Sequence, residues 1–325
     1  MRVALLSYRS KPHCGGQGIY IRHLSRELVA LGHEVEVFSG PPYPILDEGV
    51  RLTKVESLDL YREPDPFRIP KLREFRDRVD VEEFLTMCTA GFPEPKTFST
   101  RVVKALAERV DDFDVVQDNQ VLGYGMLDIE DLGLPLVTTI HHPITFDRRI
   151  DLQAATTWRR RLTVRRWYGF LRMQAKVARA ARWILTPSEA SKRDIVADFG
   201  VDAARIQVIP LGVDDVFRPP TAPRVPGRLL AMASADAPMK GIATLLEAFA
   251  KLRTERDLEL YLVTKPVAGG RTEQLVDRLG IKDHVHFVHG VSDDELVALM
   301  GSAEIACVPS LYEGFSLPTA ELMAC

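Results

Sequence analysis

Cysteine is scarce in this chain of 325 residues, which has four. None of them forms a CxxC pair, and no histidine cluster stands at zinc-ligand spacing. The pattern excludes the disulfide framework of a small secreted domain and a cysteine-based zinc site, so the thiols are interpreted as reduced. The four residues are Cys14, Cys88, Cys307 and Cys325.

Long apolar runs are also absent. No stretch approaches the roughly 18 residues that mark a membrane-spanning helix. The first eight residues, MRVALLSY, lack the apolar core and the small-residue cleavage site of a signal peptide, and they are typical of a first β-strand. We therefore expect a cytoplasmic protein.

Neither sign of charge is in excess. Forty-two basic residues oppose 45 acidic ones, and the net charge is −3. A mildly acidic chain is poorly suited to the phosphate backbone of nucleic acids, so we expect no nucleic-acid partner.

The length exceeds what one hydrophobic core usually supports, which predicts two α/β domains. The first forty residues have a strand–loop–helix–strand form, which implies a parallel sheet with ligands at the C-terminal edge of its strands. The helix has one apolar face (Ile21, Leu24, Leu28 and Leu31) and Gly32 as its C-cap. Residues 41–100 show only weak periodicity. Buried strands are predicted at 3–6, 34–38, 115–117, 136–140 and 183–186.

A second domain begins after Val208–Asp214. The stretch from Arg218 to Gly227 holds four prolines and no periodicity, which is typical of a linker. Strands and helices then alternate again, which predicts a second doubly wound domain. The predicted division is a first domain over 1–213, a linker over 214–227 and a second domain over 228–325. In the second domain, strands are predicted at 229–234, 258–264, 285–288 and 304–308. Helices are predicted there at 241–253, 271–280 and 292–301.

Two carboxylates eight positions apart, Glu313 and Glu321, flank a predicted helix start. Ser316 is a good N-cap, and Pro318 suits the first turn of a helix because its fixed φ is helical and its missing N–H is not needed there. Helix-start N–H groups between the two glutamates could cradle a phosphate. Both glutamates could also be plain surface residues near a helix N-terminus, where negative charge is favoured.

Three further motifs fall at predicted strand ends. The glycine-rich turn at 15–18 is either a tight strand–helix connection or a place where the backbone approaches a phosphate. A nicotinamide-binding site is disfavoured, because such a site needs an acidic residue at the end of the next strand to hold the ribose, and none is present. Lys240 is either an exposed loop lysine or a cation for a diphosphate leaving group. Of His141 and His142, at least one is expected to face a ligand; the alternative is a packed loop histidine.

The segment 156–183 contains nine Lys or Arg residues, no acid and all three tryptophans. Its spacing predicts a helix with an apolar stripe and a basic side. One interpretation is a core-packing helix with a solvated face. The other is attraction to anionic lipid headgroups or to a phosphorylated acceptor, which would place the protein peripherally at the inner membrane face.

Together these motifs resemble the retaining GT-B glycosyltransferases of family 4, the glycosyl transferases group 1. Glu313 to Glu321 resembles the Glu-x7-Glu signature of that family, and Gly15-Gly16 its N-terminal Gly-rich loop. Val208–Asp214 is similar to its interdomain element, and Lys240-Gly241-Ile242 to its "KG" segment. The resemblance implies a GT-B fold, in which two doubly wound Rossmann-like domains face a cleft, and a cytoplasmic enzyme that transfers a sugar from a nucleotide-diphosphate donor with retention.

The resemblance also implies residue roles. Glu313 would lie by the transferred sugar, His141 near the donor sugar, and Glu321 on the ribose hydroxyls. Lys240 would supply charge to the diphosphate, and no metal or other cofactor would be needed. The amides expected to contact the diphosphate are those of Gly15, Gly16, Gly314, Phe315, Ser316 and Leu317.

Two departures from the family pattern stand out. The arginine that family members place about five residues before the lysine is missing, because residues 233–236 read Ala-Ser-Ala-Asp. The chain also stops four residues after Glu321, which makes the second domain incomplete against the family pattern. The alternatives are therefore an inactive or sugar-nucleotide-binding remnant of such an enzyme, or a GT-B enzyme of different chemistry such as an epimerase.

Overall fold

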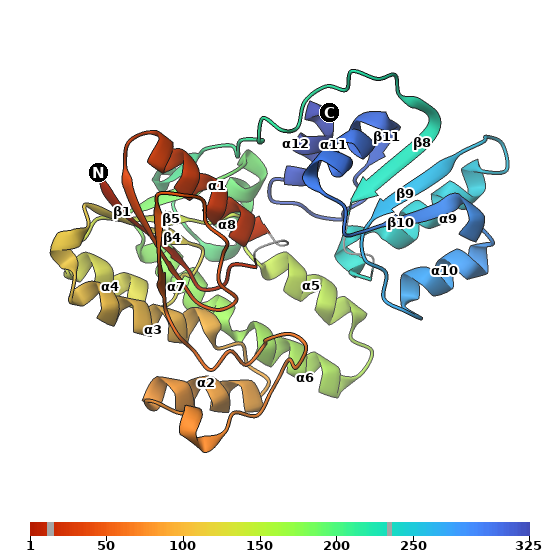
Figure 1. Cartoon of the computed structure of the whole chain (residues 1–325). Coiled ribbons are helices and arrows are strands. Elements are labelled where there is room, and N and C mark those ends of the chain that lie inside the picture. Colours follow the sequence, from red (N-terminus) through yellow and green to blue (C-terminus); the bar gives the residue numbers. More distant parts are fainter. Residues whose placement is uncertain (12–15, 233–235) are drawn as a thin grey trace. The chain divides into compact units, whose positions relative to one another are not determined.

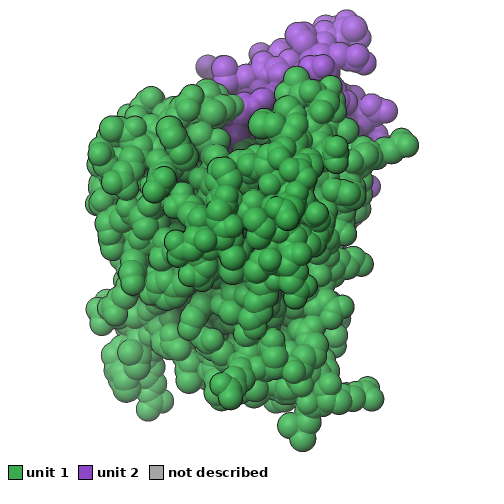
Figure 2. Space-filling model, turned by 90° about the vertical axis from the view of Figure 1, so that its left-hand side faces the viewer, with its two compact units in different colours: residues 1–210 green, residues 211–325 purple. Residues whose placement is uncertain are grey.

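A computed structural model describes residues 1–11, 16–232 and 236–325. The chain forms two compact units, Met1–Pro210 and Leu211–Cys325, which are coloured separately in Figure 2. Each unit has a parallel sheet and hydrophobic cores of its own.

The first unit contains a seven-stranded sheet of order β3-β2-β1-β4-β5-β6-β7, in which every pairing is parallel. The order reverses between β1 and β4, which is the topological switch point where doubly wound sheets bind their ligands. The strands are β1 (Arg2–Ser7), β2 (Glu34–Ser39), β3 (Val50–Lys54), β4 (Val115–Asn119), β5 (Leu136–Thr139), β6 (Trp183–Thr186) and β7 (Ile206–Val208).

Helices cover both faces of this sheet (Figure 1). Side chains of β1 alternate, because successive residues of a strand point to opposite faces. Val3 and Leu5 pack with Ile21 of α1, whereas Ala4 and Leu6 belong to the core that includes α3, α4, α7 and α8. The helices are α1 (Gly16–Ala30), α2 (Arg78–Cys88), α3 (Glu94–Ala107), α4 (Gly125–Asp131), α5 (Thr145–Ala154), α6 (Trp158–Trp167), α7 (Leu171–Ala180) and α8 (Glu189–Phe199).

The structure corrects the sequence-based reading of this unit in two places. Leu31 is 73% exposed because α1 ends at Ala30, so it is not part of the buried helix face; Gly32 does adopt the positive φ of a C-cap. The basic segment is two helices, α6 and α7, separated by a 3-10 turn over Tyr168–Phe170.

The second unit contains a four-stranded parallel sheet of order β10-β9-β8-β11. The α9 and α10 helices contribute to the core on one face, and α11 and α12 to that on the other. Its elements are β8 (Val225–Met232), α9 (Ile242–Leu252), β9 (Glu259–Val263), α10 (Arg271–Leu279), β10 (Val285–Val288), α11 (Asp293–Ser302), β11 (Ala303–Cys307) and α12 (Leu317–Ala324).

The predicted linker 214–227 overlaps the start of β8, because Val225 already pairs with Ala303 of β11. Pro226 follows where the register of this pair shifts, and such an irregularity tolerates a residue without an N–H. Throughout the described ranges, every helix is too short or too polar to span a lipid bilayer.

Candidate active site

In the second unit, β11 leads through a loop into α12, as the sequence predicted. Ser316 is the N-cap of α12, and its side chain accepts the N–H of Thr319 at 3.4 Å. Gly314 is buried on the loop, while Phe315, Ser316 and Leu317 are half-buried. The predicted diphosphate-binding segment therefore forms the start of a helix, where the N–H groups give a positive potential.

Lys240 and Glu313, 73 positions apart, form an ion pair in this unit. Lys240 Nζ lies 2.7 Å from Glu313 Oε1, with the two side chains 34% and 28% exposed. Lys240 ends the 3-10 turn Pro238–Lys240 just before α9, and Glu313 follows β11. The structure thus brings together two residues that the sequence selected independently, at the switch point between β8 and β11.

Gly241 explains why these two segments approach so closely. Its φ is +65°, and a Cβ at this position would stand 2.0 Å from the carbonyl oxygen of Pro309. The N–H of Leu311 also donates to the oxygen of Met239 at 2.8 Å. Only glycine allows this contact, so the "KG" pair sets the spacing between Lys240 and Glu313.

Glu321 lies in the second turn of α12 and is half-buried. Burial raises the pKa of its carboxyl group. Within the described residues, no hydrogen bond or ion pair reaches its side chain, from the Lys240–Glu313 pair or from elsewhere. A half-buried carboxyl group of this kind is suited to accept hydroxyl donors from a ligand.

In the first unit, His141 follows β5 at the C-terminal edge of the sheet. Its Nε2 lies 2.7 Å from Oδ1 of Asn119, and its ring meets Tyr20 edge-on at 4.7 Å. Burial lowers the pKa of His141 to about 3, so the ring is neutral at physiological pH. Since the amide oxygen can only accept, Nε2 carries the proton and Nδ1 is left as an acceptor.

A second contact fixes the backbone of His141. The side chain of Gln120 accepts the N–H of His141 and donates to the oxygen of His142, both at 2.7 Å. Gln120 itself has a positive φ of 55°. The strained turn is held by buried Asp118, whose carboxylate accepts the N–H groups of Val121 at 2.8 Å and Leu122 at 3.1 Å.

Asp118, Asn119 and Gln120 were not selected from the sequence. The signal was present, because three consecutive polar residues stand at the C-terminal end of β4, the last two residues of the strand and the one after it, at the edge where ligands bind. The ring of His142 lies 4.0 Å from Asp147. His141 is therefore the histidine whose ring is held by the end of β4, through Asn119.

The Gly-rich turn is described only in part. Gly15 lies outside the described residues. Gly16 begins α1, and among the described residues no atom beyond its chain neighbours and its own helix lies within 4 Å of the position of a Cβ there. Gly18 is the glycine that packing requires, because a Cβ would meet the oxygen of Lys11 at 2.3 Å. Asn119 links this turn to His141, since its Nδ2 is 3.4 Å from the oxygen of Gln17.

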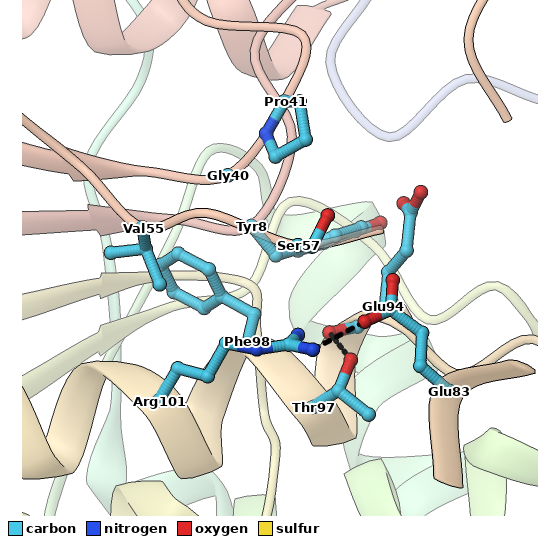
Figure 3. A pocket seen from close by; sticks show the side chains of 10 residues that line it. All are labelled: Tyr8, Gly40, Pro41, Val55, Ser57, Glu83, Glu94, Thr97, Phe98 and Arg101. Atoms are coloured by element: carbon cyan, nitrogen blue, oxygen red, sulfur yellow. Dashed lines mark hydrogen bonds and ion pairs between the residues drawn. The ribbon is translucent and has the colours of Figure 1, made fainter. Parts of the chain in front are cut away.

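A small cavity lies between the ends of β1 and β2 and the start of α3 (Figure 3). Its volume of about 10 Å³ has room for roughly one water molecule, so a sugar does not fit. Glu83 turns its carboxylate to Arg101 at 2.5 Å, while Glu94 points away from that pair (Figure 3) and lies 3.5 Å from Arg9. Burial raises the pKa of Glu94 to about 8. The cavity is a buried charge cluster, not a substrate pocket.

Comparison with known proteins assigns the chain to a family. The model of Glycosyltransferase Family 4 matches residues 14–217, more than half of the chain, and that of Glycosyl transferases group 1 matches residues 214–325. The chain belongs to glycosyltransferase family 4. It is a glycosyltransferase, as the sequence motifs indicated.

Curated relatives of this family 4 enzyme align with the whole of the given chain and are themselves longer. The MMP alpha-(1->4)-mannosyltransferase of Mycolicibacterium hassiacum is 61% identical over 325 residues, which cover 100% of this chain and 79% of that protein. The D-inositol 3-phosphate glycosyltransferase of Arthrobacter sp. is 30% identical over 356 aligned positions, covering 100% and 77%.

Solved structures confirm the GT-B fold. The sucrose-phosphate synthase of Thermosynechococcus elongatus has a TM-score of 0.68 at 19% identity, covering 100% of this chain and 79% of its own. Anabaena Alr3699/HepE, solved in complex with UDP and glucose, has a TM-score of 0.63 at 16% identity, covering 100% and 78%.

Proposed function

We propose that this family 4 glycosyltransferase transfers mannose from a nucleotide-diphosphate mannose to a carbohydrate acceptor and forms an α-(1→4) linkage. The 61% identical relative is named an alpha-(1->4)-mannosyltransferase, and a structural neighbour was solved with UDP and glucose. The observation that carries the proposal is the Lys240–Glu313 pair beside the start of α12.

The chemistry follows from the charges at that edge. When the bond between C1 of the sugar and the diphosphate oxygen breaks, its electron pair stays on the diphosphate. Lys240 and the N–H groups at the start of α12 stabilise that growing negative charge, and such fixed donors act without a metal ion. Glu313 holds Lys240 until the donor arrives and then lies beside the sugar.

An α-linked donor and an α-linked product imply retention. The acceptor oxygen would bond to C1 on the face that the diphosphate leaves, and its proton would pass to the departing phosphate oxygen. Neutral His141 offers Nδ1 as an acceptor for a hydroxyl group, a role that an imidazolium could not fill.

The test is transfer from GDP-mannose, with UDP-glucose and UDP-galactose as alternative donors and α-mannosides as acceptors, with and without a chelator. We expect a mannosylated product from GDP-mannose alone, unchanged by chelation, with the one-bond C1–H1 coupling of an α-mannoside. A β-mannoside would contradict retention. Nucleotide binding without turnover would indicate a sugar-nucleotide-binding remnant.

We also propose that the enzyme is cytoplasmic and that α6 brings it to an anionic membrane surface. Trp158 and Leu162, one turn apart on α6, are 71% and 59% exposed. Five arginines and no acid share the same ten residues. An apolar strip between cations is suited to the headgroup region of an anionic bilayer.

Vesicle flotation tests the membrane proposal. We expect the enzyme to float with vesicles that contain anionic phosphatidylglycerol and not with neutral phosphatidylcholine vesicles. A Trp158→Ala, Leu162→Ala double variant should lose binding, whereas Leu252→Ala, at an exposed apolar site on α9, should keep it. Equal behaviour on both vesicles would leave only a structural role for α6.

A further inference from the structure

We infer that Lys265 supplies a second positive charge to the donor diphosphate, in place of the arginine that family members carry before the "KG" lysine. The inference deepens the proposed function and rests on it. The positions near that arginine, 233–235, read Ala-Ser-Ala and lie outside the described residues; Asp236 follows. A cation must therefore come from another strand end.

Strand register places Lys265 at the right point of the sheet. The β9 strand lies between β8 and β10, and its last residue, Val263, pairs with Met232, the last residue of β8. The N–H of Thr264 then donates to the oxygen of Val288 at 2.9 Å. Lys265 is the next residue, so it leaves the sheet one strand away from the segment that carries Lys240.

Asp236 anchors the loop that Lys265 begins. Its Oδ1 accepts the N–H and the hydroxyl of Thr272, both at 2.9 Å, at the start of α10. A Cβ on Gly270 would meet Asp236 Oδ2 at 2.4 Å, so the last residue of the loop 265–270 packs tightly against this carboxylate. The acidic residue that ends the "Ala-Ser-Ala-Asp" segment thus holds a lysine-bearing loop at the edge of β8.

The charge state of this edge favours Lys265 as a ligand for an anion. Lys240 is already neutralised by Glu313. Lys265 is exposed and makes no hydrogen bond or ion pair with any residue of the described ranges. A diphosphate carries about two negative charges, and an ammonium group with three rotatable donors is suited to either phosphate.

Isothermal titration calorimetry of the full chain with GDP, UDP and their nucleosides tests the inference. For Lys265→Ala we expect diphosphate binding at least about tenfold weaker than for the wild type, since a hydrogen bond to a charged group contributes about 1.5–3 kcal/mol. Lys265→Arg should restore most of the affinity. Lys251→Ala, at an exposed site on α9, should stay within about twofold. Thermal unfolding of each variant reports whether it is folded.

Four results would overturn the inference. A Lys265→Ala variant that binds the diphosphate as the wild type does would remove the role. An equal loss for nucleoside and diphosphate would make the residue structural. A loss in Arg271→Ala, with none in Lys265→Ala, would assign the charge to the start of α10. Failure of the wild type to bind either diphosphate would overturn the proposed function itself, and this inference with it.

Discussion

The two sheet edges that carry the candidate residues hold them by different means. In the first unit, His141 is neutral, half-buried and fixed by the amide side chains of Asn119 and Gln120. In the second unit, Lys240 and Glu313 are charged, partly exposed and fixed by each other. Amide contacts around a neutral ring preserve an acceptor for a sugar hydroxyl, whereas an exposed cation is able to exchange its partner for a phosphate.

This difference suggests a division of labour between the units. The charged edge is suited to a ligand that brings negative charge and leaves with more of it, such as a nucleotide diphosphate. The neutral edge is suited to hydroxyl groups, which need oriented donors and acceptors and gain little from net charge. Substitutions that alter one edge and leave the other intact sharpen or break the comparison.

Replacement of Glu313 by alanine should have the largest effect. The change removes the carboxylate that we propose lies beside the transferred sugar, and we expect turnover to fall about 10²- to 10³-fold or more. Steady-state kinetics with saturating donor measures this loss, and thermal unfolding checks that the fold persists. Unchanged turnover in Glu313→Ala would remove its proposed role.

Replacement of Gly241 by alanine should disturb the same edge through the backbone. The new Cβ would press on the oxygen of Pro309, and the positive φ adds about 1–2 kcal/mol. Gly280→Ala is the matched control, because its φ is +66° but no atom lies within 4 Å. We expect Gly241→Ala to lose at least about 1–2 kcal/mol more stability than the control, and activity as well. Equal costs in urea unfolding would mean that the contact does not set the geometry.

Much of the fold could be predicted from the sequence, because buried parallel strands are short apolar runs bounded by turns. The sequence identified β6 and β10 with their observed bounds and placed β1, β2 and β9 within a residue at each end. The secondary structure of residues 41–100 could not be predicted, because β3 is only half-buried and has no clear apolar pattern. In addition, acidic residues in the helices of this stretch pair with arginines that are distant in sequence, as Glu83 does with Arg101.

The charged candidate residues of the second unit were predictable. Glycine, lysine and glutamate at strand ends are visible as motifs, so Lys240 and Glu313 were found. Asn119 and Gln120 were not found, because each contacts a histidine 21 or 22 positions later in the chain and no short sequence motif marks such a contact. The loop of Lys265 likewise depends on strand order, which a motif does not reveal.

Replacement of Asn119 by aspartate tests whether the neutral state of His141 matters. A carboxylate 2.7 Å from Nε2 would stabilise the imidazolium and raise the pKa of His141 from about 3. We expect a rate about tenfold lower at pH 6 that recovers as the pH rises above the new value. Asn119→Ala should lose activity without the pH dependence. Parallel pH profiles for both variants would contradict a role for the neutral ring.

Replacement of Glu94 by glutamine should have the smallest effect, on stability alone. The pKa of Glu94 is raised to about 8, so the native state keeps a proton that the unfolded chain loses above about 4.5. Stability therefore falls as the pH rises through this window. The melting temperature of Glu94→Gln should equal that of the wild type near pH 5 and exceed it at pH 9. The increase should be about 2–4 °C for each kcal/mol of unfolding free energy that the variant regains. Glu48→Gln, at an exposed site, is the control; equal differences at both pH values would argue against a protonated Glu94.

The most direct test of this division of labour is the affinity of GDP for Lys240→Ala and His141→Ala, measured by calorimetry beside the turnover of each. We predict that Lys240→Ala binds the nucleotide at least about tenfold more weakly, whereas His141→Ala binds it as the wild type does and loses turnover. The opposite pattern, with nucleotide affinity dependent on His141 and independent of Lys240, would contradict the account.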